Sequence, residues 1–175
     1  MGTGRHTLSR GQKASLALMA FFMACSVAMM SCSSINCPVQ NTVRMQFAIY
    51  DNKGEANFVD SLWVWTERQD GIDTLILNAL TGKSTFTLPI SYMHPEDQLI
   101  FFIADTSHVQ TIDTVWLKKD DIPHFESVDC AAHFFHQLTA VRSTHYGIDS
   151  VTIVNSLVNY DQNKTHLRIY FKARH

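Results

Sequence analysis

Hydrophobic and polar residues alternate with a period of two along most of the chain after Val43. In VRMQFAIY, residues 43–50, this alternation places Val43, Met45, Phe47 and Ile49 on one face. In FVDSLWVWTE, residues 58–67, it sets Trp63 and Trp65 against Leu62 and Val64. A period of two is typical of half-buried β-strands, so both segments are predicted strands.

The same pattern and its turn signals predict a β-rich domain. Asp70-Gly71 predicts a hairpin before a strand at 72–78, and Pro89 marks an edge or an end of the strand at 84–90. Residues 98–105, QLIFFIAD, read as a fully buried strand. Further strands are expected at 111–119, 124–128, 147–158 and 165–172. Eight or nine strands with short polar turns favour an all-β fold, an antiparallel β-sandwich, possibly immunoglobulin-like.

The segment DCAAHFFHQLTAV, residues 129–141, is ambiguous. As a helix it would gather Phe134, Phe135, Leu138 and Val141 on one stripe, whereas as a strand it would align Cys130, Phe134, His136 and Leu138. The strand-rich context favours a strand.

The first 31 residues have the composition of a secretory signal. Arg5, Arg10 and Lys13 precede an uncharged apolar run from Ala14 to Ser31. A stably inserted signal anchor is the alternative, because a transmembrane helix needs only about 17 to 25 apolar residues.

The end of the apolar run resembles the lipobox of bacterial lipoproteins. Ser31 precedes Cys32, and Met29 stands at the third position before the cysteine, where leucine is more typical. The resemblance implies cleavage before Cys32 and lipid attachment to it, with Cys25 in FFMAC as a competing site. The expected organisation is a signal peptide at 1–31, a lipidated tether at 32–42 and one β-sandwich domain at 43–175. Several acyl chains on one residue would anchor the protein firmly in a membrane.

The charge of the mature chain argues against a nucleic-acid partner. Cleavage before Cys32 leaves eleven Lys and Arg against sixteen acids, a formal charge of −5. Because nucleic-acid binding requires a clustered basic face and the longest basic run is Lys118-Lys119, no nucleic-acid partner is expected.

Two cysteines, Cys37 and Cys130, remain once Cys25 has left with the signal and Cys32 carries lipid. In an oxidising compartment they are expected to form a disulfide. The alternative is one buried thiol in the core and one thiol near the terminus.

Short motifs offer little catalytic or metal chemistry. His133 and His136 form an HxxH pair, but on a strand the odd spacing sends the two rings to opposite faces, so no metal site is expected. TGKS at 81–84 lacks the earlier glycine of a P-loop and is read as a hairpin turn, and DNKGE at 51–55 lacks the twelfth-position glutamate of an EF-hand. No GxSxG elbow marks a hydrolase. We therefore expect no cofactor and no enzymatic activity.

Six aromatic residues could stack on a sugar or a peptide if several share an exposed face, although core packing accounts for their spacing better. They are Tyr50, Trp63, Trp65, Tyr92, Trp116 and Tyr170.

Several short segments together resemble a family of uncharacterised cell-envelope lipoproteins from Bacteroidota. They are Cys37-Pro38, TLPI at 87–90, IDTVWL at 112–117, ESVDC at 126–130, and the closing IDSVTIVN and LRIYF. The resemblance covers nearly all of the mature chain and implies a lipoprotein with no established activity. Residues 33–36, SSIN, lack the acids that follow the lipidated cysteine in surface-displayed members. The expected location is therefore the outer membrane, facing the periplasm.

The sequence thus predicts a lipid-anchored structural or binding module with an unknown protein or glycan partner. The alternative is a carbohydrate-binding or hydrolytic accessory lipoprotein.

Overall fold

The computed structural model describes residues 10, 11, 19, 43–67, 71, 73–105, 107, 109–127, 130 and 132–172. The segment Cys37–His175 forms one compact unit, distinct from Met1–Asn36. The predicted signal peptide and tether lie outside the described residues, except for Arg10, Gly11 and Met19. Within the described part of the chain, no helix is long and apolar enough to cross a membrane.

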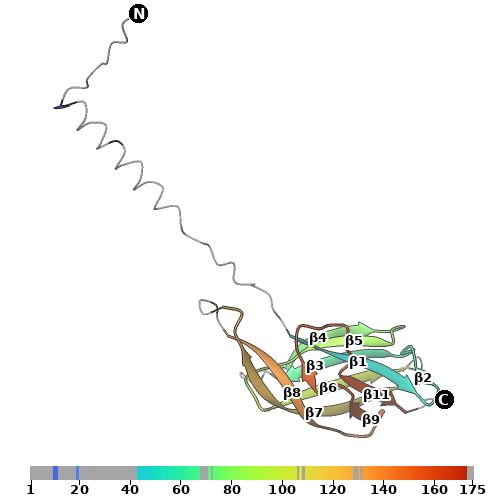
Figure 1. Ribbon diagram of the computed structural model, residues 1–175. Coiled ribbons are helices and arrows are strands. Elements are labelled where there is room, and N and C mark those ends of the chain that lie inside the picture. The colour runs from blue at the N-terminus through green and yellow to red at the C-terminus, as the bar shows by residue number, and fades with distance from the viewer. Residues whose placement is uncertain are drawn as a thin grey trace, which may run out of the picture. The chain divides into compact units, whose positions relative to one another are not determined.

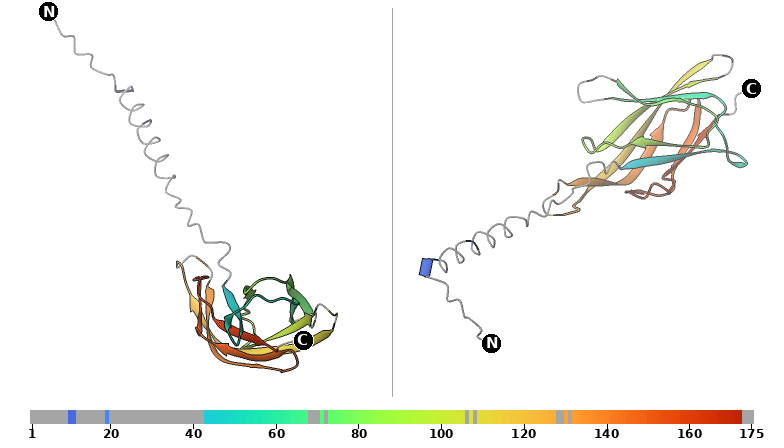
Figure 2. Two further views of the ribbon diagram at one scale, coloured as in Figure 1. Left: turned by 90° about the vertical axis from the view of Figure 1, so that its right-hand side faces the viewer. Right: turned by 90° about the horizontal axis from the view of Figure 1, so that it is seen from above.

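In the part of the chain that the structure describes, eleven strands form two sheets that pack against each other, which confirms the predicted β-sandwich (Figures 1 and 2). The five-stranded sheet contains β1 (Arg44–Asp51), β2 (Gly54–Glu55), β5 (Thr85–Pro89), β9 (Ile148–Ile153) and β11 (Leu167–Phe171). The six-stranded sheet has the order β10 (Leu157–Val158), β8 (His133–Ser143), β7 (Gln110–His124), β6 (Glu96–Ala104), β3 (Ser61–Glu67) and β4 (Asp73–Leu80).

Strand pairing is antiparallel with one exception among the described strands. The first and last long strands of the domain, β1 and β11, pair in parallel, with Phe47 opposite Leu167 and Ile49 opposite Ile169. The six-stranded sheet is built largely from consecutive strands, an order different from the two sheets of an immunoglobulin constant domain.

The core follows the predicted alternation. Val43, Met45, Phe47 and Ile49 of the first strand region are all buried. Phe47 stacks on Phe86 of β5 with ring centroids 4.8 Å apart, and it also meets Phe101 of β6 from the opposite sheet. The predicted strand at 129–141 is confirmed from His133 onward.

Other expectations were wrong in detail. Residues 98–105 are buried on one face only, because Ile100 and Phe102 point to the outer side of the six-stranded sheet. In the predicted strand at 124–128, the described residues 125–127 are not in a strand, and His124 is the last residue of β7, since the pairing of β7 with β8 continues past the end of β6. TGKS is a connection between sheets rather than a hairpin, because β4 and β5 belong to different sheets.

The connection from β8 to β9 crosses between the sheets and is fixed by one buried acid. Asp113 accepts hydrogen bonds from the backbone N–H groups of Tyr146, Gly147 and Ile148 at 2.6–2.8 Å and from the Thr144 hydroxyl at 2.6 Å. Burial raises its pKa, but the hydrogen bonds outweigh this, and the pKa of Asp113 is lowered. The Asp113 carboxylate therefore holds the β8–β9 connection against β7.

Candidate functional site

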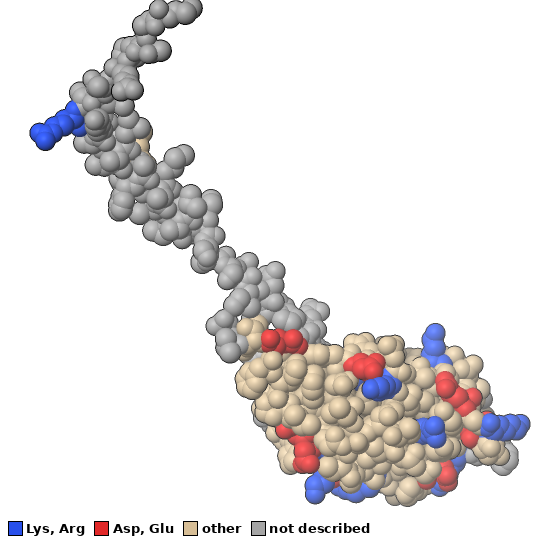
Figure 3. Space-filling model, in the orientation of Figure 1, with Lys and Arg blue, Asp and Glu red and all other residues tan. Residues whose placement is uncertain are grey.

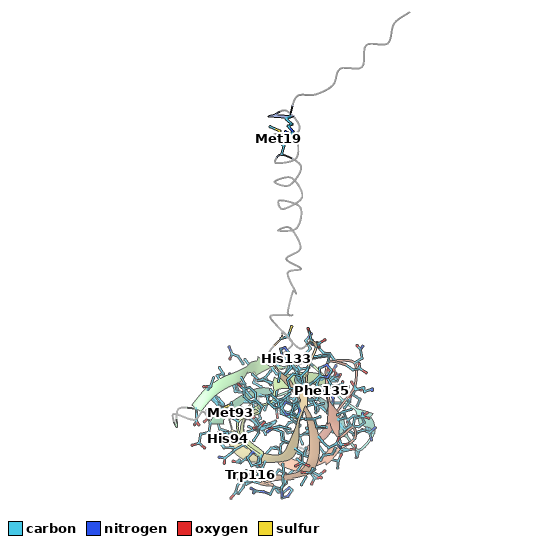
Figure 4. All side chains as sticks on the ribbon, turned by 60° about the vertical axis from the view of Figure 1, so that its left-hand side comes forward. Met19, Met93, His94, Trp116, His133 and Phe135 are labelled. Atoms are coloured by element: carbon cyan, nitrogen blue, oxygen red, sulfur yellow. The ribbon has the colours of Figure 1, made fainter. Side chains whose placement is uncertain are left out.

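A cleft of about 400 Å³ opens at one end of the sandwich. There β7 and β8 form an arm beyond the last pairing of β6 with β7, at Glu96 and Lys118, and the short strand β10 pairs with β8 along this arm. The cleft is lined by Val43, Ile90, Tyr92, Ala132, His133, Phe134 and His136. We call this region the cleft end; Figure 4 labels His133 of its lining, and Met93 and His94 in the connection between β5 and β6.

Two aromatic rings form a wall of the cleft. Tyr92, in the connection after β5, stacks on Phe134 of β8, with ring centroids 5.0 Å apart and planes 12° from parallel. Tyr92 keeps 59% of its surface exposed, although its ring is already positioned by Phe134. A wall of this kind offers a flat apolar surface to a ligand.

Strand alternation and a bulge bring charged residues to the inner face of the arm. Along β7 the inward positions continue from Val115 and Leu117 to Lys119 and Asp121. The β8 register shifts between Lys118 and Lys119, so that Lys119 faces Leu138 and Asp121 faces His136. Bulges commonly redirect side chains in this way next to functional sites.

Lys119 is the centre of this charged cluster and is only 1% exposed. Its Nζ lies 3.8 Å from Asp97 Oδ1 and 3.5 Å from Asp121 Oδ1, and it donates a hydrogen bond to the carbonyl oxygen of His94. Burial raises the pKa of Asp97, which the Ser91 N–H and the Lys119 charge only partly offset. The cluster joins β6, β7 and the segment before β6.

His136 lies between this cluster and the cleft. Its Nδ1 is 2.6 Å from Asp121 Oδ1, and the side chain is almost fully buried. Burial lowers the pKa of His136, although the hydrogen bond to Asp121 opposes this shift. The neutral ring donates its Nδ1–H to the carboxylate, which leaves Nε2 as an acceptor. The site can therefore accept a hydrogen bond from a hydroxyl, amide or ammonium group.

The predicted HxxH pair is only partly brought together. Both His133 and His136 line the cleft. In the sheet register, however, His133 lies opposite His124, whereas His136 lies opposite Asp121 and forms the floor of the cleft. In the described part of the chain, no group of three His, Cys, Asp or Glu residues could hold a metal ion.

The tryptophans are not in the core, contrary to expectation. Trp63 and Trp65 lie half-buried on the outer face of the six-stranded sheet, each in edge contact with Phe102 at 5.5 Å and 6.0 Å. Trp116 lies on the same face, with the Arg142 guanidinium 3.9 Å from its ring centroid. Leu62 and Val64 occupy the inner face of β3, and the alternation of the strand therefore places Trp63 and Trp65 on its outer face.

The DNKGE turn also has a simple structural account. The Asp51 carboxylate accepts hydrogen bonds from the backbone N–H groups of Lys53 and Gly54 at 2.7 Å and 3.0 Å. This local arrangement closes the turn between β1 and β2.

Of the cysteines predicted for lipidation and for the disulfide, Cys130 is among the described residues. Cys25, Cys32 and Cys37 lie outside the described residues. Cys130 is 8% exposed, and its N–H donates to the Ser127 carbonyl oxygen at 3.2 Å. Lipid attachment to Cys32 and the Cys37–Cys130 bridge therefore stay predictions.

Sequence reasoning missed the charged cluster of buried Asp97, buried Lys119 and half-buried Asp121. One signal was present: Asp97 stands in register with the apolar positions of β6, and Lys119 and Asp121 stand in register with those of β7. A charged residue at an inward position of a strand needs a partner, which predicts such a cluster.

Comparison with known proteins identifies the family but no relative of known activity. The chain matches no curated protein and no solved structure. One family model, described as a family of unknown function, matches residues 61–171, a segment that runs from β3 to β11 and includes the charged cluster. Because this match covers more than half of the chain, the protein belongs to the family of unknown function DUF6452.

Proposed function

We propose that the protein is a lipid-anchored, non-enzymatic binding module of the cell envelope, held in the outer membrane and facing the periplasm. The anchor rests on the basic start, the apolar run to Ser31 and the lipobox-like context of Cys32. The resemblance to uncharacterised Bacteroidota lipoproteins supports the same location.

The cleft is the observation that carries the binding role. Its volume of about 400 Å³ falls in the usual range of small-ligand sites, roughly 300 to 1,000 Å³. Its wall is the Tyr92–Phe134 stack, and its floor presents His136. The ligand that fits best combines an apolar or planar part with a hydrogen-bond donor.

The floor favours binding over catalysis. Lys119 Nζ lies within 4 Å of a carboxylate oxygen of Asp97 and of Asp121, and Asp121 is shared between Lys119 and His136. A general base works best when its pKa is near the working pH, whereas burial lowers the pKa of His136. The cluster is better suited to holding the arm rigid beside the cleft.

A bridge between Cys37 and Cys130 is part of the proposal. It would close a loop of about 93 residues, for which the chain-entropy model gives roughly 4 to 5 kcal/mol before any strain. Because Cys130 stands two residues before Ala132 of the cleft, the bridge would attach the start of the domain near this end.

Lipidation can be tested by metabolic labelling with palmitate. Cys32→Ala should abolish labelling and move the protein out of the detergent-phase membrane fraction, whereas the matched variant Cys25→Ala should be labelled normally. Unchanged labelling of Cys32→Ala would identify Cys25 as the anchor, and labelling of neither cysteine would contradict the lipoprotein assignment.

The binding role can be tested with two tyrosine variants that are both highly exposed in the wild type. Tyr92→Ala removes one ring of the cleft wall, whereas Tyr146→Ala removes a 73% exposed ring from the β8–β9 connection. Native mass spectrometry of each protein after incubation with fractionated envelope extract should show a ligand on the wild type and on Tyr146→Ala, with occupancy reduced at least fivefold on Tyr92→Ala. Equal occupancy of all three would remove the cleft from the proposal.

Carbohydrate binding on the outer face is a second candidate. Trp63, Trp65 and Phe102 form a half-buried aromatic cluster on that face, and aromatic faces stack on sugar rings. Charged side chains of both signs are scattered over the face shown in Figure 3, without a continuous basic patch. A glycan array should show binding by the wild type that is lost in Trp65→Ala; binding retained by this variant, or no binding by the wild type, would exclude the face as a glycan site.

A further inference from the structure

We propose that the cleft end of the sandwich rests on the bilayer surface, with Tyr92, Met93 and Phe125 in contact with lipid. This orientation rests on the proposed lipid anchor at Cys32 and adds to it a surface and a partner, the lipid headgroup region.

The three side chains are large, mainly apolar and exposed. Tyr92, Met93 and Phe125 keep 59%, 50% and 63% of their surfaces accessible. Tyr and other large apolar side chains are favoured at the interface between lipid and water, where an apolar body meets a hydrated edge.

Contacts and register place these residues at one end of the domain. Tyr92 stacks on Phe134, which faces Pro123 of β7 in the sheet register. Phe125 follows two residues after Pro123. The connection after β5 and the end of β7 therefore meet at the cleft end.

The chain from the anchor enters the sandwich at the same end. Val43, the first residue of the described sandwich, lines the cleft together with Tyr92. Eleven residues separate Cys32 from Val43, so a fully extended chain reaches at most about 40 Å. If Cys37 is bridged to Cys130, the five residues from Cys32 to Cys37 reach only about 18 Å. An anchor at Cys32 would therefore keep the cleft end within about 40 Å of the lipid.

The two segments that form this surface carry little charge, so its contact with lipid does not depend on attraction to charged headgroups. Residues 91–95 and 122–127 contain no Lys or Arg, and their one acid, Glu126, has its Oε1 3.4 Å from His124 Nε2. His94 and Tyr92 are the other titratable groups of these two segments. Contact should therefore depend little on salt and should occur on zwitterionic as well as anionic lipid.

Two methionines provide a direct measurement. After Cys32 the chain contains only Met45, which is 1% exposed in the core, and Met93, which is 50% exposed at the cleft end. The full lipoprotein, labelled with ¹³C at the methionine methyl groups, is reconstituted in phosphatidylcholine nanodiscs that carry a spin label on the lipid headgroup. The Met93 signal should fall below half of its intensity in unlabelled discs and should lose more intensity than the signal of Met45, which is buried two residues beyond Val43.

A double variant and a control test the contact itself. Tyr92→Ser/Phe125→Ser should restore most of the Met93 intensity, whereas Tyr146→Ser should not. Tyr146 binds Asp113, which lies ten residues along β7 from Pro123, roughly 30 Å away. An unchanged Met45 shift in each protein shows that the fold is intact.

The outcomes separate this orientation from the anchor. Full Met93 intensity in a protein whose intact mass shows lipid on Cys32 would overturn the orientation and leave the anchor standing. Absence of lipid from Cys32 would overturn both. Broadening of Met93 in discs without spin label, increasing with protein concentration, would indicate a second copy of the chain as the partner and would also overturn the proposal.

Discussion

Replacing Lys119 by methionine tests the charged cluster beside the cleft. Methionine preserves most of the side-chain volume but removes the ammonium that lies 3.8 Å from Asp97 and 3.5 Å from Asp121. Asp97 is 8% exposed, so the variant would leave a buried carboxylate without its cation. Breaking a buried ion pair by removing one partner costs about 3 to 5 kcal/mol.

The effect can be measured by urea unfolding at pH 7, with Lys164→Met as the matched control. The midpoint of Lys119→Met should fall by roughly 2 M urea, because small domains lose about 1 to 3 kcal/mol per molar urea. The midpoint of Lys164→Met should change little, since Lys164 pairs with Asp161 at 3.3 Å in solvent, with more than half of its side chain exposed.

Two further measurements make the reasoning refutable. Adding Asp97→Asn to Lys119→Met should recover at least half of the loss and should yield a folded protein even if the single variant does not fold. The deficit of the single variant should also shrink between pH 7 and pH 5, because protonation neutralises the stranded carboxylates. A loss below about 1 kcal/mol at pH 7 would refute the assignment of Lys119 as the buried counter-ion.

The remaining predictions concern the stability of the domain at low pH, the Asp113 carboxylate and the two cysteines of the predicted disulfide. Burial lowers the pKa values of His136 and His166 in the folded chain, so the unfolded chain takes up protons first as the pH falls. The free energy of unfolding should therefore fall as the pH drops below about 6.5. A urea midpoint that stays constant from about pH 7.5 to 5.5 would contradict this prediction. Asp113→Asn should lower the free energy of unfolding by about 1.5 to 3 kcal/mol, because it weakens hydrogen bonds to three backbone N–H groups. Denaturant titration measures this change. An unchanged free energy of unfolding would show that the β8–β9 connection does not need the charge of Asp113. Thiol trapping of the mature protein without reductant should find Cys37 and Cys130 unreactive, and alkylation of either would exclude the bridge.

The period-two alternation of the sequence determined the fold class. Met45 and Phe47 are buried as it predicted, because an extended strand on a sandwich must turn alternate residues toward the core. The edge position of Pro89 followed from its missing N–H, and β5 pairs with β1 alone among the described strands. The strand alternation and the edge position of Pro89 depend on the properties of neighbouring residues in the sequence, so the sequence alone predicts them.

Only the tertiary structure decided which strands meet and what the cleft contains. The parallel pairing of β1 with β11 joins residues 120 positions apart, and no sequence period specifies it. The alternation showed that Trp63 and Trp65 share a face but not that this face lies outside. Asp97, Lys119 and His136 come together because the arm runs beyond β6 and a register shift in β8 sets His136 opposite Asp121. The sequence thus determined which side chains can share a face, whereas long-range pairing and close packing decided which faces are buried and which charges meet there.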